Sequence, residues 1–185
     1  MKRLSRAIFG ALLLWSFPSA GQVPGSVELG LDAGFNVSFV DDSDQELFSI
    51  GLPAADFSSL LQNVRAGIPV SQRGTVESSL GFSALDDGYT TYWRLGIGMD
   101  YLYLLSAPSC GSSPFVRLGG IFNVLGSSRK SDAQVGVATG AGFKLMVGQT
   151  WGTRFEAGIV RMFRAGELPG RWDMTGSVGL SFFVR

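Results

Sequence analysis

Residues 27–40 show a two-residue alternation of apolar and polar side chains. Seven apolar residues, from Val27 to Phe39, occupy every second position, and Gly or polar residues fill the six positions between them. Successive side chains of a β-strand point to opposite faces, so this pattern predicts a strand. At about 3.3 Å per residue it is longer than most strands of soluble domains. A strand of this length suits a tilted crossing of a hydrocarbon core about 30 Å thick.

The alternation returns seven more times along the chain. The connections are rich in Gly, Ser, Pro and Asp, and the longest is the acidic stretch 41–61, which we interpret as a loop. Arg161 breaks the parity, because it would face outward unless a β-bulge resets the register. The further predicted strands are residues 63–70, 76–84, 89–103, 116–124, 134–147, 151–159 and 172–184. The shorter predicted connections are residues 71–74, 86–88, 107–114, 126–132, 148–150 and 165–170.

Eight alternating strands in sequence predict an all-β fold, an eight-stranded antiparallel up-and-down transmembrane β-barrel. An even strand count puts both termini on one side, the side of the shorter turns. The apolar face carries almost no charge, and its aromatic residues gather near the strand ends, as in the aromatic girdles of membrane barrels. The alternative is a soluble calyx, which would need the apolar face inside and the charged face outside. The aromatic residues are Phe39, Tyr89, Trp93 and Trp172 towards the loops, and Tyr101, Tyr103, Phe143, Trp151 and Phe182 towards the turns.

The other face of these strands collects eleven charged residues. Six acids nearly balance five bases, and charges enclosed in a narrow interior must pair or lose their charge. An eight-stranded barrel is just wide enough to be filled by side chains. We therefore predict an ion-pair network that plugs the lumen. Its members are Glu28, Asp32, Glu77, Asp100, Glu156 and Asp173 with Arg65, Arg94, Arg117, Lys144 and Arg154.

The N-terminal residues have the features of a signal peptide. A basic start (Lys2, Arg3, Arg6) precedes a short apolar run and then small residues, which favours cleavage near Ala20 or Gly21. We expect residues 1–21 to be the signal peptide and residues 22–185 the barrel domain. A membrane anchor is the alternative, but the run is shorter than the roughly 20 residues of a spanning helix. Removal of the signal peptide would take away three of the 15 basic residues and leave 12 basic and 15 acidic residues. A net charge of −3 gives no basic surface for nucleic acid.

The composition limits the chemistry. The chain has no His, which excludes a Ser-His-acid triad. The pair Asp86/Asp87 fits a hairpin loop better than acid–base catalysis, and the acidic stretch 41–61 does not match the spacing of an EF-hand. The single cysteine, Cys110, cannot form an intramolecular disulfide. We therefore expect no catalytic residues, no cofactor and no metal site.

With these features the chain resembles the small outer-membrane β-barrel family, of the OmpA transmembrane-domain and OmpX type, over about residues 22–185. The C-terminal segment 177–184 resembles the family's assembly signal through Ser177, Gly179, Phe182 and Val184, although family members usually finish on an aromatic residue. The resemblance implies the outer membrane of a Gram-negative bacterium, contact with its lipid and lipopolysaccharide, and recognition of the C-terminal strand by the barrel assembly machinery.

The function is less constrained than the fold, because this fold carries adhesins, resistance proteins and enzymes alike. We expect a non-enzymatic structural or surface-interaction role, in adhesion or envelope integrity, with loop 41–61 as the main contact surface for a ligand. Two alternatives remain. One is a narrow or gated pore, which would need the lumen ion pairs to rearrange. The other is a lipid-modifying barrel enzyme that works without His.

Overall fold

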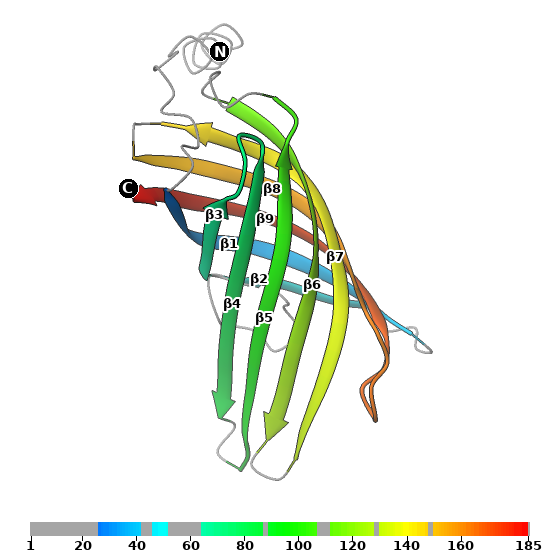
Figure 1. The fold of residues 1–185 in the computed structure, drawn as a ribbon. Helices are drawn as coiled ribbons and strands as arrows, with labels where there is room; N and C mark the ends of the chain where they lie inside the picture. The colour runs from blue at the N-terminus through cyan, green and yellow to red at the C-terminus, as the bar shows by residue number, and fades with distance from the viewer. Residues whose placement is uncertain are drawn as a thin grey trace, which may run out of the picture.

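The computed structural model describes residues 26–41, 46–51, 64–86, 89–106, 112–127, 130–147 and 150–184. The expected signal peptide, Asp87 and Cys110 lie outside these residues. The described residues form an antiparallel sheet of nine strands (Figure 1). They contain no helix with the length and apolar character needed to cross a membrane. The strands are β1 (Val27–Val40), β2 (Glu46–Gly51), β3 (Val64–Pro69), β4 (Gly74–Asp86), β5 (Thr91–Leu104), β6 (Ser112–Ser127), β7 (Ser131–Met146), β8 (Trp151–Met162) and β9 (Arg171–Val184).

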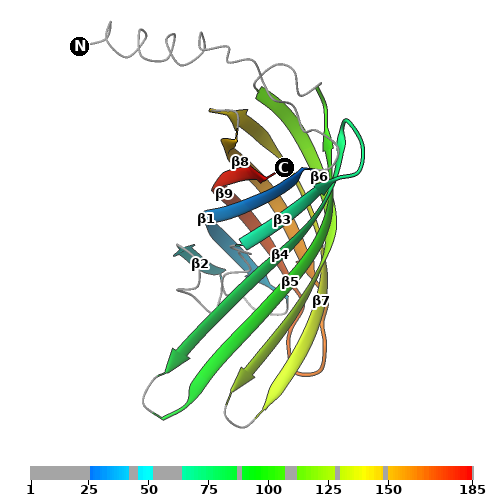
Figure 2. The ribbon, with the colours of Figure 1, turned by 60° about the vertical axis from the view of Figure 1, so that its left-hand side comes forward.

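The sheet closes on itself through its first and last long strands. Neighbouring strands from β3 to β9 pair in sequence order, and β9 pairs with β1 from Val27 opposite Val184 to Val40 opposite Arg171. Figure 2 shows β1 and β9 side by side, with the C-terminus beside the start of β1. The prediction of an all-β, up-and-down barrel is confirmed. We call the end that holds the start of β1 and the end of β9 the turn side, and the opposite end the loop side.

Although the sheet has nine strands, the barrel wall is eight strands around, because β2 and β3 pair with different parts of the same edge of β1. β2 pairs with residues 34–39 of β1, and β3 pairs with residues 28–31. The prediction that 41–61 is a single loop is therefore wrong for residues 46–51, while residues 42–45 and 52–63 lie outside the described part. The physical reason is the lipid environment. Backbone N–H and C=O groups find no water in a hydrocarbon core, so the loop-side half of β1 needs a strand on this edge.

The assignment of the two faces is confirmed along the barrel. On β5, Ile97, Met99 and Tyr101 are exposed on the outer surface, whereas Gly98 and Asp100 between them are buried. The outward Thr139 hydroxyl finds a backbone partner, since Oγ1 donates to the Arg117 carbonyl at 3.2 Å. The exterior is therefore an almost unbroken apolar surface, as a lipid-facing wall requires.

Several predicted boundaries move because hairpins pair further than alternation alone indicates. β6 begins at Ser112 and ends at Ser127, so residues 112–114 and 126–127 belong to a strand rather than to connections. β8 continues in unbroken register to Met162, so Arg161 faces outward without a bulge. Tyr89 precedes β5 and is 96% exposed, which removes it from the predicted aromatic girdle. The remaining girdle residues lie on the outer face as predicted.

Candidate functional site: the charged lumen

Nine of the eleven predicted lumen charges form one chain of contacts in the turn-side half of the barrel. Arg65 Nε lies 2.5 Å from Asp32 Oδ2, and its Nη1 lies 3.0 Å from Glu28 Oε1. Lys144 Nζ continues the chain at 2.5 Å from Glu28 Oε2 and 3.1 Å from Glu77 Oε1. Because these residues come from β1, β3, β4 and β7, the contacts cross the lumen from wall to wall.

Arg154 carries the chain on from Glu77. Its Nη1 lies 2.7 Å from Glu77 Oε2, and its Nη2 lies 2.5 Å from Glu156 Oε2. Arg117 joins Glu156 Oε1 at 2.6 Å to Asp100 Oδ2 at 3.2 Å. The guanidinium of Arg154 also lies 4.6 Å from the centroid of the Phe115 ring, a cation–π contact. This second half adds side chains from β5, β6 and β8.

The network is almost dry and nearly neutral. No side chain in it is more than 16% exposed. Five carboxylates face four cations, so one negative charge is in excess when all nine are ionised. From β9, the Ser181 hydroxyl donates to Glu28 Oε1 at 2.7 Å and accepts from Arg65 Nη2 at 3.1 Å. In a low-dielectric interior such pairs interact far more strongly than at a surface.

Inward glycines make room for these charges. A Cβ added at Gly119 would overlap the Asp100 carboxylate, and one at Gly179 would overlap the Asp32 carboxylate. At Gly30 the added atom would lie 2.5 Å from Arg65 Cζ. Gly30 thus leaves room for a long Arg side chain, and Gly119 and Gly179 leave room for carboxylates.

Apolar side chains bound the charged layer on both sides. Leu102, Leu104 and Phe115 form a buried cluster at the turn-side end of the lumen. A second cluster lies towards the loops and contains Ile121, Ala138, Val160 and Met162. The sequence interpretation missed both clusters as lumen layers, although the inward parity of Leu102 and Leu104 was a usable signal. Apolar layers above and below the ion pairs limit the access of water to them.

Little space remains between the charged layer and the loop-side cluster. A cavity of about 50 Å³ is lined by residues such as Asp32, Asp100, Arg117, Ile121 and Val160. A water molecule needs about 10–15 Å³ of cavity volume, so this cavity has room for a few water molecules. Three buried polar atoms around it, Asp32 Oδ1, Asp100 Oδ1 and Arg117 Nε, have no protein partner and suit such waters.

Two predicted members do not belong to this chain of nine. Asp173 is buried and accepts from Arg171 Nε at 3.2 Å, a partner that the sequence interpretation did not name. Arg94 is also buried, but it lies six residues from Asp100 on β5, which is about 20 Å along a strand. Alternation assigned both residues to the correct face. It could not assign their height in the lumen.

A separate pair of charges ties the loop-side end of β8 to the connection that follows β1. Arg161 donates hydrogen bonds to Asp41 Oδ1 at 2.8 Å and Oδ2 at 2.5 Å, and its guanidinium lies 5.1 Å from the centroid of the Trp172 ring. These hydrogen bonds lower the pKa of the Asp41 carboxyl below its ordinary value. Across the next connections, Lys130 Nζ lies 2.5 Å from Glu167 Oε2.

The residues of the predicted assembly signal all lie on β9, the strand that closes the barrel against β1. Ser177 and Gly179 face inward, and Phe182 and Val184 are exposed on the outer face. Their role in assembly stays a prediction. Within the described residues no group of three or more Cys, Asp or Glu side chains is placed to hold a metal ion.

Comparison with known proteins finds likeness in structure only. Neither a protein-family model nor a curated protein sequence matches the chain. Among solved structures, Neisserial surface protein A (NspA) is similar, with a TM-score of 0.61 at 12% identity over 85% of this chain and 98% of NspA. The outer membrane protein OprG of Pseudomonas aeruginosa has a TM-score of 0.54 at 11% identity, covering 89% of this chain and 98% of OprG.

A third similar structure is Ail, the attachment invasion locus protein of Yersinia pestis, in complex with the heparin analogue sucrose octasulfate. Its TM-score is 0.51 at 11% identity, with 88% of this chain and all of the Ail chain covered. At these identities the likeness concerns the fold. The chain therefore has the fold of the small eight-stranded β-barrels of Gram-negative outer membranes.

Proposed function

We propose that this protein is a non-conducting, non-enzymatic barrel of a Gram-negative outer membrane, which presents its loop-side connections at the cell surface. The observation that carries this proposal is the chain of nine buried charges from Asp32 to Asp100, which crosses the lumen between two apolar clusters. A solute would have to break several buried ion pairs to pass. The apolar outer wall supports the membrane location, and the even strand count supports a turn side that faces the periplasm.

Planar-bilayer recording tests the closed lumen. The wild-type protein should show almost no conductance, because its lumen holds only a small cavity. Removing the turn-side apolar layer, by Leu104→Ala with Phe115→Ala, should allow brief openings. The matched control, outward-facing Leu118→Ala, should stay closed. A stable, large conductance of the wild type would contradict the proposal and favour the narrow-pore alternative.

The surface role is proposed from the loop-side contacts and from the ligand of a structural neighbour. Asp41–Arg161 joins the connection after β1 to the end of β8, and Lys130–Glu167 joins two connections, which holds these residues together on the loop side. Sulfated carbohydrate, the ligand class in the Ail complex, is the first class to test, with Lys130 and Arg164 as exposed cations.

Retention of bacteria on immobilised sulfated polysaccharide is a direct assay for this role. Cells with the wild-type protein should be retained better than cells that lack it. Replacing Lys130 and Arg164 with Ser should lower retention to the level of the deletion strain. If all three strains are retained equally, this ligand class is excluded.

A further inference from the structure

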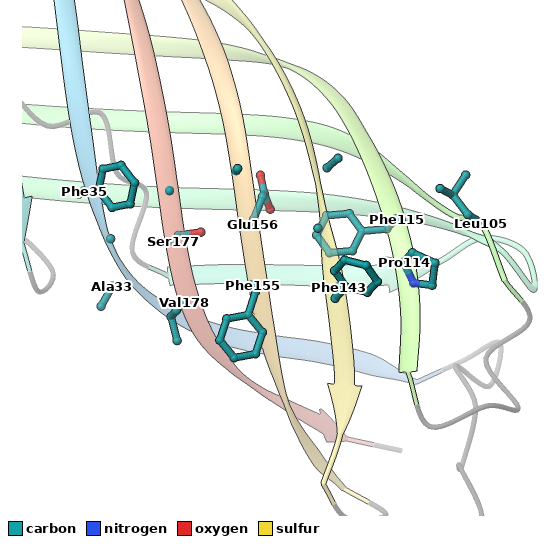
Figure 3. A pocket seen from close by; sticks show the side chains of 15 residues that line it. Ala33, Phe35, Leu105, Pro114, Phe115, Phe143, Phe155, Glu156, Ser177 and Val178 are labelled. Carbon is teal, nitrogen blue, oxygen red and sulfur yellow. The ribbon is translucent and has the colours of Figure 1, made fainter. Parts of the chain in front are cut away.

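A trough crosses the outer, apolar face of the barrel (Figure 3). It encloses about 660 Å³, within the range of roughly 300–1,000 Å³ that is usual for small-molecule pockets. Its floor contains three small outward-facing residues on neighbouring strands. Ala141 on β7 is opposite Ala157 on β8, and Ala157 is opposite Gly176 on β9. Small residues in register across three strands leave a depression in a wall that is otherwise covered by large side chains.

Large apolar side chains border this depression. The next outward row towards the turn side contains Phe143, Phe155 and Val178, which are also opposite one another on the same three strands. The ring of Phe35 on β1 lies over Gly176, where it occupies the place of a Cβ. In Figure 3, Phe35 lies at one end of the trough, and Phe143 and Phe155 lie along it.

The trough runs obliquely from the middle of the wall to the turn-side rim. Phe35 and Gly176 lie near the middle of β1 and β9, whereas Pro114 at the other end is two residues from the start of β6. Four strand spacings separate β1 from β6 along this row, which is about 19 Å. Half of a hydrocarbon core is about 15 Å thick. The trough therefore has the length of one acyl chain that lies obliquely in a single leaflet.

We propose that this trough binds one acyl chain of a phospholipid from the turn-side leaflet. The lining is apolar, and the open end lies at the rim where head groups of that leaflet would be. A flexible hydrocarbon chain that fills the trough gains dispersion contacts along its whole length. Lipopolysaccharide would enter from the other leaflet, whereas the trough opens at the turn side.

A second copy of the chain fits this surface less well. A two-fold dimer would place the same patch of both copies face to face. Two concave surfaces would then enclose an unfilled volume, whose lining loses its contacts on one side. A rod-shaped chain fills the trough without such a void. The inference rests on the membrane location proposed above, and the membrane fractionation described in the Discussion tests that location separately.

Native mass spectrometry of the protein, extracted from membranes in mild detergent, tests this site. The wild type should retain one phospholipid. Filling the trough with Ala141→Leu and Ala157→Leu should lower the lipid-bound fraction at least tenfold. The matched control, Ala84→Leu with Ala133→Leu, adds the same atoms at outward positions outside the trough and should retain the lipid. Equal retention by the filled variant overturns the proposal. So does retained lipopolysaccharide in place of phospholipid, or a wild-type dimer that the filled variant loses.

Photolabelling of the wild type provides a second measurement that needs no folded variant. The protein is reconstituted with phosphatidylethanolamine that carries a diazirine group in its acyl chain. Label should concentrate at least threefold on Phe143 and Phe155 relative to Val76 and Ile97, which are outward-facing residues of β4 and β5 away from the trough. Even labelling of all four positions overturns the proposal.

Discussion

At the scale of single residues, the lumen depends on close contacts between charged side chains and the backbone of the neighbouring strand. Gly119 and Gly120 are neighbours on β6, but they face opposite sides. An added Cβ at Gly119 would overlap the Asp100 carboxylate and the Met99 carbonyl, whereas at Gly120 its nearest atom would be the Gly136 carbonyl oxygen at 3.9 Å. A backbone carbonyl cannot rotate away as a side chain can, so the inward site has little freedom to adjust.

Gly119→Ala should therefore destabilise the barrel by about 1–3 kcal/mol, the usual range for overpacking. Gly120→Ala is the matched control and should be neutral or stabilising by up to about 1 kcal/mol, because it reduces the entropy of the unfolded chain. Urea titrations of both variants in the same lipid vesicles measure the difference. Equal stability of the two variants would mean that the inward contact is not present.

Arg154 contacts two carboxylates of the network, those of Glu77 and Glu156, and the Phe115 ring. Arg154→Met leaves buried carboxylates short of a partner and should cost about 3–5 kcal/mol of unfolding free energy. Adding Glu156→Gln returns the nine-residue chain to an excess of one negative charge and should recover part of the loss. A cost below about 1 kcal/mol for the single change would indicate that water screens the lumen pairs.

Asp41 provides a pH-dependent prediction outside the membrane. Its folded-state pKa is lowered by the hydrogen bonds from Arg161, so its contribution to loop order is present above the unfolded pKa. That contribution is lost as the pH falls through the folded pKa. Arg161→Met should raise the Asp41 pKa towards its ordinary value, as measured by carboxyl-carbon NMR. An unchanged pKa in this variant would show that the two groups do not interact in solution.

At the scale of elements, β1 organises the wall because it pairs with β9 along one edge and with both β2 and β3 along the other. Its length matches that of β9, which lets the barrel close without a frayed end. On β1 the outward positions from Val27 to Phe39 are apolar, and the inward positions from Glu28 to Ser38 are polar or Gly. Each strand is therefore expected to tolerate charge on its two faces very differently.

Val137→Arg places a cation on the lipid face of β7 and should cost about 2–4 kcal/mol near the midplane. Val137 is 48% exposed on the outer surface and lies opposite Gly120, in the middle of its strand. Gln72→Arg, in the exposed turn before β4, is the control and should cost little. The free energy of unfolding in vesicles distinguishes them, and equal tolerance at both sites would mean that this face does not contact lipid.

At the scale of the whole molecule, the lumen is layered. The ion-pair chain lies between the Leu102–Leu104–Phe115 cluster and the Ile121–Ala138–Val160–Met162 cluster. The turn-side cluster joins β5 to β6, the loop-side cluster joins β6, β7 and β8, and the ion-pair chain joins side chains of β1, β3, β4, β5, β6, β7 and β8. This makes the barrel one cooperative unit rather than a set of independent hairpins.

The whole molecule should therefore fractionate with outer membranes and resist unfolding by detergent. On gels, the unheated protein should migrate differently from the boiled protein, because the intact barrel stays compact. Recovery of the mature protein in the soluble periplasmic fraction would contradict the membrane location. A single migration position before and after boiling would contradict the cooperative, layered core.

Alternation alone predicted eight of the nine strands, their two faces and the set of lumen charges. A period of two is a local property of the sequence. A register slip of one residue would move every side chain to the other face, so the pattern determines which face each side chain occupies. Alternation at Val27–Val40 and its repeats therefore predicted the barrel and the inward position of Glu28, Glu77 and Arg154. Strand ends were less well determined, because hairpin pairing extends into residues such as Ser112 that carry no alternation.

Only the tertiary structure decided which charges meet. Lys144 and Glu28 are 116 positions apart in the chain, and their contact depends on the stagger of every strand between them. The same stagger brings Ala141, Ala157 and Gly176 into one trough. The pairing of β2 with β1 likewise has no signal in the local sequence pattern. It is the lipid environment that requires a partner strand on that edge of β1. The height of a side chain within the barrel depends on the registers of all the strand pairs, so no single segment of the sequence determines it.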